Sequence, residues 1–105
     1  MLLVNTDYIS GKELETLGIV KGSIVQTKNF GKDFMAGIKT LVGGEVTEYT
    51  KMLNQARQIA VKRMVDEAQA IGADAIVNVR YASSSVMQGA AEVIAYGTAV
   101  RYKNL

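Results

Sequence analysis

The acidic side chains are the residues of this 105-residue chain that are best suited to chemistry, because carboxylate oxygens can bind a hard cation. Their spacing favours no single site. None of the acids matches a calcium-binding EF-hand loop, and Asp66 and Glu67 are neighbours on an expected helix, so they point apart. Solvated surface charge is the simpler interpretation of the seven candidate acids, which are Asp33, Glu45, Glu48, Asp66, Glu67, Asp74 and Glu92.

The sequence contains no histidine and no cysteine. A Ser-His-Asp or Cys-His nucleophile is therefore excluded within this chain, and so is a zinc site built on histidine and cysteine. Catalysis would need carboxylate, lysine or tyrosine chemistry, or a borrowed group, and no spacing supports it. We expect a protein that is not an enzyme and uses no cofactor, with a carboxylate or lysine enzyme as an open alternative.

The run Gly43-Gly44-Glu45 raises the question of an anion site, because a helix N-terminus offers free N–H groups. No Lys-Ser or Lys-Thr pair follows at P-loop spacing, and the glycines follow an expected helix, unlike those of a dinucleotide-binding loop. The favoured interpretation is a joint between two helices, with Thr47 capping the second.

Three further residues are candidates for ligand contact. Tyr49 lies in the first turn of the longer helix, where its ring is expected to pack and its hydroxyl to bond a backbone group. Arg80 lies mid-strand beside Asn78 and could face a ligand, a neighbouring subunit or solvent. Asp74 follows the expected helix cap at Gly72, where a turn role is the alternative.

The elements that must position these residues are predicted from hydrophobic spacing. A short strand at 2–5 and a helix at 10–18 precede a strand at 19–30 with a bulge at Gly22. Helices follow at 31–44 and 47–71. The chain ends in a strand from 74 with Val77, Val79 and Tyr81 on one face, a polar turn at 83–85, and a long final strand that pairs with it as a hairpin.

These elements predict a single α+β domain over residues 1–105, a two-layer fold with an antiparallel sheet packed on the long helix. The apolar stripe of that helix consists of Tyr49, Met52, Leu53, Ala56, Ile59, Ala60, Met64, Ala68 and Ile71.

Self-association is expected because the longer helix would span roughly 38 Å, whereas a compact domain of this length is only about 33 Å across. The final strand also has two apolar faces. Small residues occupy one face, from Ala91 to Ala99, and larger residues such as Ile94, Tyr96 and Val100 occupy the other. A second subunit is the favoured cover for the larger face, and the short N-terminal helices are the alternative.

Other partners are not expected. The formal charge is +2 and the basic residues are scattered, whereas nucleic-acid binding requires a clustered basic face. No apolar run approaches the ~20 residues of a membrane span. The N-terminus has too few consecutive apolar residues for a secretory signal. The expected location is the cytoplasm.

The run "FMAGIKTLVGGEVTEYTKMLNQARQIAVKRMVDEAQAIGADAIVNVR", from Phe34 to Arg80, and the closing "YGTAVRY" resemble the YbjQ-like family, which carries a heavy-metal-binding label. The resemblance implies a dodecin-like βαββ subunit and a homo-oligomeric ring, a pentamer or decamer. Similar chains carry acids along the strand after "GADA" and an arginine after the double glycine, where this chain has Asn78, Arg80, Ala82 and Glu45. Soft metals thus lack obvious ligands beyond the methionines, of which Met52 and Met64 belong to the apolar stripe.

The leading hypothesis is a ring-forming, non-enzymatic protein of unknown function that binds an unidentified small ligand at subunit interfaces. Metal binding, as the family label suggests, is the alternative, with no metal ligands assigned. The candidate ligand-binding residues are Gly43, Gly44, Glu45, Tyr49, Asp74 and Arg80.

Overall fold

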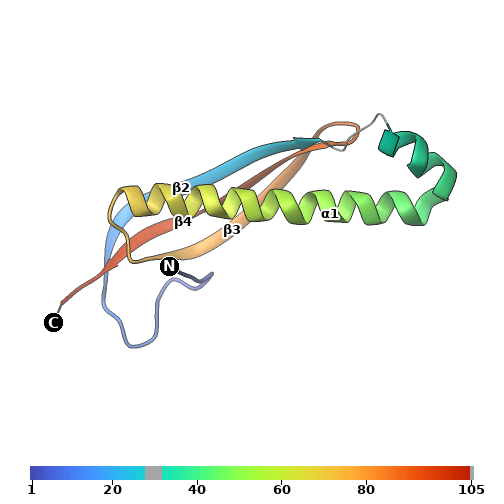
Figure 1. Cartoon of the computed structure of the whole chain (residues 1–105). Coiled ribbons are helices and arrows are strands. Elements are labelled where there is room, and N and C mark those ends of the chain that lie inside the picture. The colour runs from blue at the N-terminus through green and yellow to red at the C-terminus, as the bar shows by residue number, and fades with distance from the viewer. Residues whose placement is uncertain (28–31, 105) are drawn as a thin grey trace.

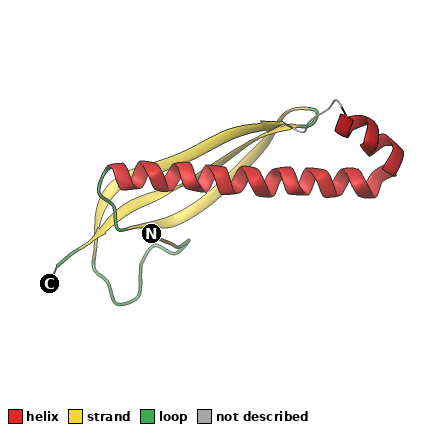
Figure 2. Ribbon diagram, viewed as in Figure 1, coloured by secondary structure: helices red, strands yellow, loops and turns green. Residues whose placement is uncertain are grey.

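The computed structural model describes residues 1–27 and 32–104, with the side chains of 32–47 left out. The elements in chain order are β1 (Leu2–Leu3), β2 (Leu14–Thr27), α1 (Lys32–Ala70), β3 (Ala75–Met87) and β4 (Ala90–Tyr102). Figure 1 shows the long helix lying along one face of the sheet, and Figure 2 shows that helix and sheet form two layers. The predicted two-layer α+β fold is confirmed.

The sheet has the strand order β1-β3-β4-β2. The final hairpin is confirmed, because β3 and β4 pair antiparallel from Ala75–Val100 to Met87–Ala90. β2 also pairs antiparallel with β4. β2 and β3 therefore run in the same direction on either side of β4, and α1 is the crossover between them. β1 pairs in parallel with β3 through Leu2 and Leu3, so the complete sheet is mixed, and the prediction of an antiparallel sheet holds only for β2, β3 and β4.

The predicted joint between two helices at Gly43 and Gly44 is wrong, since both glycines lie within the single helix α1. A glycine inside a helix costs about 1 kcal/mol relative to alanine, which a long helix packed on a sheet can tolerate. Figure 1 shows the first turns of α1 bent away from the axis of its longer part, beyond the end of the sheet. The expected overhang of the helix is therefore present.

The N-terminal helix predicted over 10–18 is also wrong. Ser10 and Gly11 form a turn, and β2 begins at Leu14. The pairing of this segment with β4 overrides its local helical pattern. The bulge lies between Thr16 and Gly18, not at Gly22. Residues 28–30 of the strand predicted over 19–30 lie outside the described residues.

The core between helix and sheet is built on alanine. Met52, Ala56, Ala60, Met64 and Ala68 recur every four residues along α1, and all are buried. They face the small-residue side of β4, where Ala91, Val93, Ala95, Gly97 and Ala99 are buried as predicted. Short side chains on both surfaces let the helix approach the sheet closely. Ile71, expected in the stripe, follows the end of α1 and is 45% exposed.

A smaller apolar cluster lies on the opposite face of the sheet, which we call the outer face. Its buried members are Ala75, Val77 and Val100, and the partly buried Val4, Ile9, Leu14 and Tyr102 pack against them. The N-terminal segment thus covers one end of the outer face. The alternative that short N-terminal helices cover this face is not met, because the described part of residues 1–27 contains no helix.

The polar turn predicted at Ser83–Ser85 is wrong as well. These serines lie inside β3, and the chain reverses at Gln88 and Gly89, where Gly89 has a φ of 76°. A positive φ is the backbone conformation in which glycine is favoured. The β3–β4 ribbon is consequently longer than the sequence suggests, and it exposes an uncharged segment, Tyr81–Met87, along one border of the sheet.

Candidate functional site

A β-bulge at Asn78 sets the geometry of the candidate site. The pairing of β3 with β4 shifts from Val77–Thr98 to Arg80–Tyr96 across this residue. Asn78 has a φ of 54°, a left-handed conformation that asparagine tolerates better than most residues. Its N–H donates to the carbonyl oxygen of Thr6 at 2.9 Å. Bulges of this kind redirect side chains and are common beside functional sites.

The bulge reverses which side chains face the helix. Ile76 and Val79 both belong to the core beneath α1, whereas Val77 belongs to the cluster on the outer face. Without the bulge, the period of two along a strand would place Val79 with Val77. The prediction that Val77, Val79 and Tyr81 share one face is therefore wrong. The bulge also places the side chain of Arg80 on the outer face.

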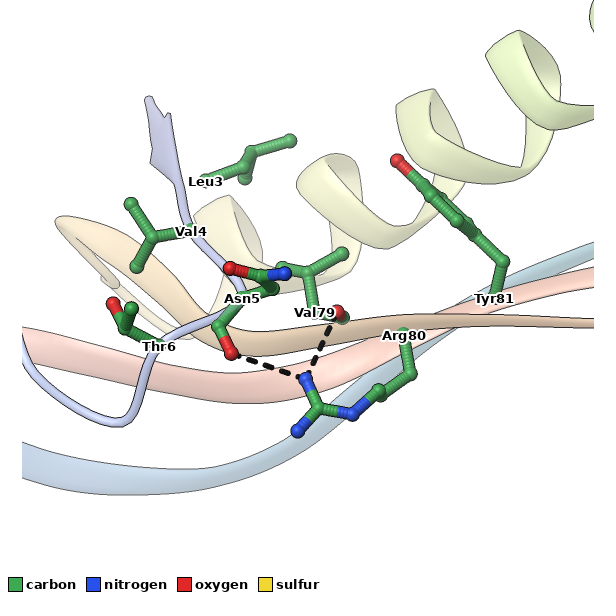
Figure 3. Close-up of a pocket in the computed structure, with 7 residues that line it drawn as sticks. All are labelled: Leu3, Val4, Asn5, Thr6, Val79, Arg80 and Tyr81. Atoms are coloured by element: carbon green, nitrogen blue, oxygen red, sulfur yellow. Dashed lines mark hydrogen bonds between the residues drawn. The ribbon is translucent and has the colours of Figure 1, made fainter.

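Arg80 lines two adjoining hollows. The larger has a volume of about 740 Å³ and lies where β1 ends beside β3. Figure 3 shows Arg80 extending to one side of β3 while Tyr81 extends to the other, toward α1. The smaller hollow measures about 340 Å³. The larger is lined by Leu3, Val4, Asn5, Thr6, Val79, Arg80 and Tyr81, and the smaller by Ile19, Asn78, Arg80, Tyr96, Gly97 and Thr98.

The guanidinium of Arg80 is held by backbone oxygens. Its Nη1 donates to the carbonyl oxygen of Asn5 at 3.1 Å and to that of Val79 at 3.3 Å. Figure 3 draws both bonds. Among the described side chains, Arg80 makes no ion pair; the carboxylates of Asp66, Glu15 and Glu13 pair with other cations. The remaining N–H groups of this arginine can therefore bind an anion.

Gly97 makes room for the bulge from the neighbouring strand. A Cβ at this position would lie 2.8 Å from Cγ2 of Ile76 and 2.9 Å from the carbonyl oxygen of Val77. Contacts this short are not accommodated without movement of the backbone. Gly97 also lines the smaller hollow with Arg80, so the same glycine fixes the strand spacing and shapes the site.

The structure places the other predicted site residues elsewhere. The Oδ2 atom of Asp74 accepts the N–H of Tyr102 at 2.8 Å, and the N–H of Asp74 donates to the carbonyl oxygen of Val100 at 2.8 Å. This carboxylate ties the loop after α1 to β4. Tyr49 is half-buried on α1 and lines neither hollow.

Gly43, Gly44 and Glu45 lie within the bounds of α1, and the side chain of Glu45 is outside the described residues. Of the predicted residues whose side chains the structure describes, Arg80 lines the described hollows together with other polar groups, and Tyr49 and Asp74 do not. The residues missed are Asn5, Thr6, Tyr81 and Tyr96. Tyr81 adjoins Arg80 in the sequence, but no local signal links Asn5 to an arginine 75 positions later.

The outer face beyond the N-terminal cluster exposes three large apolar side chains to solvent, beside the charged Lys21 and Arg80. Ile19 is 80% exposed, Val25 57% and Tyr96 40%. Ile19 pairs with Thr98, Val25 with Glu92, and Lys21 with Tyr96, so these side chains share one face of β2 and β4. Arg80 lies on the same face, since it pairs with Tyr96.

The described residues hold no group of three or more acidic, histidine or cysteine side chains arranged to bind a metal ion. In the same part of the chain, no helix is long and apolar enough to cross a membrane.

The fold and site define a class of small α+β protein, in which one long helix covers one face of a four-stranded sheet and an arginine lies on the other. The chain belongs to the YbjQ family, whose model, described as "Putative heavy-metal-binding", matches residues 1–103. It is 69% identical over 102 residues to a UPF0145 protein of Alkaliphilus metalliredigens, covering 97% of this chain and 99% of that protein.

Two further relatives span almost the same length. A UPF0145 protein of Clostridium novyi is 65% identical over 101 residues, with coverage of 96% and 98%, and one of Methanosarcina acetivorans is 55% identical over 105 residues, with coverage of 99% of each chain. A crystal structure of a DUF74 family protein of unknown function from Pediococcus pentosaceus has a TM-score of 0.62 at 14% identity, covering 98% of both chains. That likeness confirms the fold.

Proposed function

We propose that this chain is the non-enzymatic subunit of a homo-oligomeric ring that binds a small anionic ligand at its subunit junctions. The uncovered part of the outer face, with Ile19, Val25 and Tyr96 exposed, is the observation that carries this proposal. A sheet face that meets water is normally polar, and large apolar side chains exposed together on such a face mark a contact with another molecule.

The shape of the chain supports self-association. Its radius of gyration is 17.5 Å and its extents are 62 × 23 × 17 Å, whereas a compact chain of this length has a radius of gyration of about 13 Å. So elongated a subunit leaves more surface in water than a compact one would. Contacts between copies would cover that surface. In a closed ring, such as the expected pentamer or decamer, every subunit makes the same contacts.

Arg80 determines which class of ligand the proposed site would bind. Its guanidinium lies between two hollows, bonds only backbone oxygens among the described residues, and shares the outer face with Tyr96. A planar guanidinium binds a carboxylate or a phosphate through two parallel N–H bonds. A copy packed on the outer face would close the smaller hollow from above. The ligand site would then lie at the junction of two subunits.

Light scattering coupled to size-exclusion chromatography tests the assembly. A ring of five or ten copies is expected at micromolar concentration. A particle of 11.3 kDa, the mass of one chain, would rule out the ring.

Ligand binding is tested separately by following the side-chain N–H resonances of arginine during titration with inorganic phosphate and with acetate. In the wild type, the side-chain N–H resonances of Arg80 should shift more than those of any other arginine. Arg80→Gln should abolish the saturable response, Arg80→Lys should weaken it, and Arg57→Gln, a matched loss of an exposed arginine, should preserve it. A linear response equal for all arginines would contradict the site.

Metal binding is the second candidate function, and the family description favours it. Carboxylates from neighbouring subunits could together form, at a junction, a set of metal ligands that one chain lacks. Calorimetric titration of the assembled protein with zinc, copper, cadmium, magnesium and calcium tests this. Saturable heat together with a rise in the melting temperature would support a site, and the absence of both for all five ions would end this candidate.

A further inference from the structure

The two long borders of the sheet differ in how their backbone groups are bonded. β2 forms one border, and two of its outward groups, in the middle of the strand, are bonded by side chains of α1. The N–H of Lys21 donates to Oε1 of Glu67 at 3.2 Å, and the carbonyl oxygen of Ser23 accepts from Nη1 of Arg63 at 2.7 Å. Charged side chains that bond a strand's outward groups are a known protection against unwanted pairing.

β3 forms the other border once β1 has ended. The N-terminal segment accompanies β3 only as far as Val79, whose N–H donates to the carbonyl oxygen of Val4 at 3.0 Å. The following segment, "YASSSVM" from Tyr81 to Met87, contains no charged residue and no proline, and every residue in it is exposed. We call Tyr81–Ser85, the part before the next bulge at Val86, the open edge.

The register identifies which groups of the open edge point outward. Because Lys21 directs its N–H to α1, its partner Tyr96 directs its backbone groups to β3, where it faces Arg80. In an antiparallel ladder these directions alternate from residue to residue. The N–H and C=O groups of Tyr81, Ser83 and Ser85 therefore point away from the sheet. Within the described residues, no hydrogen bond to these backbone groups is formed from that side.

We propose that the open edge pairs antiparallel with the same edge of a second copy, across a two-fold axis at Ser83. This deepens the proposed assembly, on which it rests: a two-fold contact cannot lie within a ring of five, so it is the contact that joins two such rings into the decamer. In this register Ser83 faces Ser83 of the second copy, and Tyr81 faces Ser85 of the second copy. All outward groups then gain partners, and the two sheets become one.

A second copy is the occupant that this edge fits best. Two-fold pairing places the residue at the axis opposite itself, so a charge at the axis would meet its own sign. The open edge carries none, and its side chains at the axis are small. The border formed by β2 is a poorer partner, because Arg63 and Glu67 already bond its middle.

The packing of Tyr81 supports the same arrangement. Tyr81 is 57% exposed and lines a groove of about 530 Å³ beside Asn54, Arg57, Gln58 and Val61 of α1. A strand added at the open edge would lie along this groove. The aromatic ring of Tyr81 would then be covered by the added strand, while α1 stays on the same face of the enlarged sheet.

Charge substitution at the axis tests the proposal. Ser83→Lys places two ammonium groups across the axis and Ser83→Glu two carboxylates, so each variant alone should raise the dissociation constant of the paired form about tenfold. An equimolar mixture should restore pairing, since opposite charges then meet. Gln88→Lys, the same charge change in the exposed turn, should leave the mass from light scattering unchanged.

Amide hydrogen exchange gives an independent readout. In the wild type, the amides of Tyr81, Ser83 and Ser85 should be protected, and Ser83→Lys should release them while Ala82 and Ser84 stay protected by β4. Free exchange at Ser83 in an oligomeric wild type would overturn the edge contact and leave the ring standing. Failure of the mixture to restore pairing would overturn the two-fold axis. A monomeric wild type would overturn both proposals.

Discussion

Gly22 of β2 lies directly beneath Ala60 of α1, with no room between them for a side chain. A Cβ at Gly22 would lie 2.1 Å from the carbonyl oxygen of Ala60 and 2.4 Å from the amide nitrogen of Met64. Both are backbone atoms of the helix and cannot rotate away. This contact therefore sets how closely the helix approaches the sheet, and with it the alanine packing along α1.

Gly22→Ala should lower the free energy of unfolding by about 3 kcal/mol, because the helix must move off the sheet and lose contacts along its length. Denaturant unfolding followed by circular dichroism measures the change. Gly11→Ala serves as the control: Gly11 has a φ of 75°, but no atom lies within 4 Å of the position that an added methyl group would take. It should cost only about 1 kcal/mol, the penalty of the left-handed backbone. Equal costs at the two positions would contradict the close-contact explanation.

The bulge at Asn78 should depend on its left-handed backbone. Asn78→Val puts a β-branched residue in this conformation and should cost about 2 kcal/mol, whereas Asn78→Gly should be nearly neutral because glycine accepts a positive φ. Thermal unfolding compares the two. If valine were tolerated as well as glycine, the backbone of residue 78 would not be what maintains the shift in register.

The carboxylate of Asp74 should contribute to stability and not to ligand binding. Asp74→Ala removes the acceptor for the N–H of Tyr102 and should cost about 1 kcal/mol. Asp74→Asn keeps an acceptor oxygen and should recover most of that loss. Both variants should retain the Arg80 response to phosphate. Loss of that response in a folded Asp74→Asn variant would return Asp74 to the candidate site.

Charge on the outer face should disrupt the proposed ring without unfolding the subunit. Ile19→Asp introduces a carboxylate where the side chain is largely in water, so the free energy of unfolding should change by less than about 0.5 kcal/mol. The mass from light scattering should fall. Ile71→Asp, an exposed isoleucine after the end of α1, is the matched control and should assemble normally. A fall in mass with both variants would point to a general effect of charge.

Hydrophobic spacing predicted the elements that carry strong local signals. The four-residue recurrence from Met52 to Ala68 specified the buried stripe of α1, and the alternation in β4 specified its small-residue face. Local signals failed between Ser10 and Gly18, where a capping pattern suggested a helix, and at Ser83–Ser85, where serines suggested a turn. In both places pairing with β4 overrode residue preference, and such pairing is not visible in a short window.

The candidate site was less predictable than the fold. Arg80 could be named as a candidate because it is a charged residue within a predicted strand. Its bond to the carbonyl oxygen of Asn5 could not be foreseen, since it joins segments from the two halves of the chain. The glycine pair drew attention for its resemblance to an anion loop, yet both glycines lie within the bounds of α1.

Residue type and short-range periodicity were enough to predict the class of fold, the buried stripe of the long helix, the final hairpin and the absence of histidine and cysteine chemistry. Other features could be seen only once the chain was folded. The bulge at Asn78, which turns Arg80 to the outer face, and the difference between the two borders of the sheet both depend on register. Register is set by contacts between strands that lie far apart in the chain.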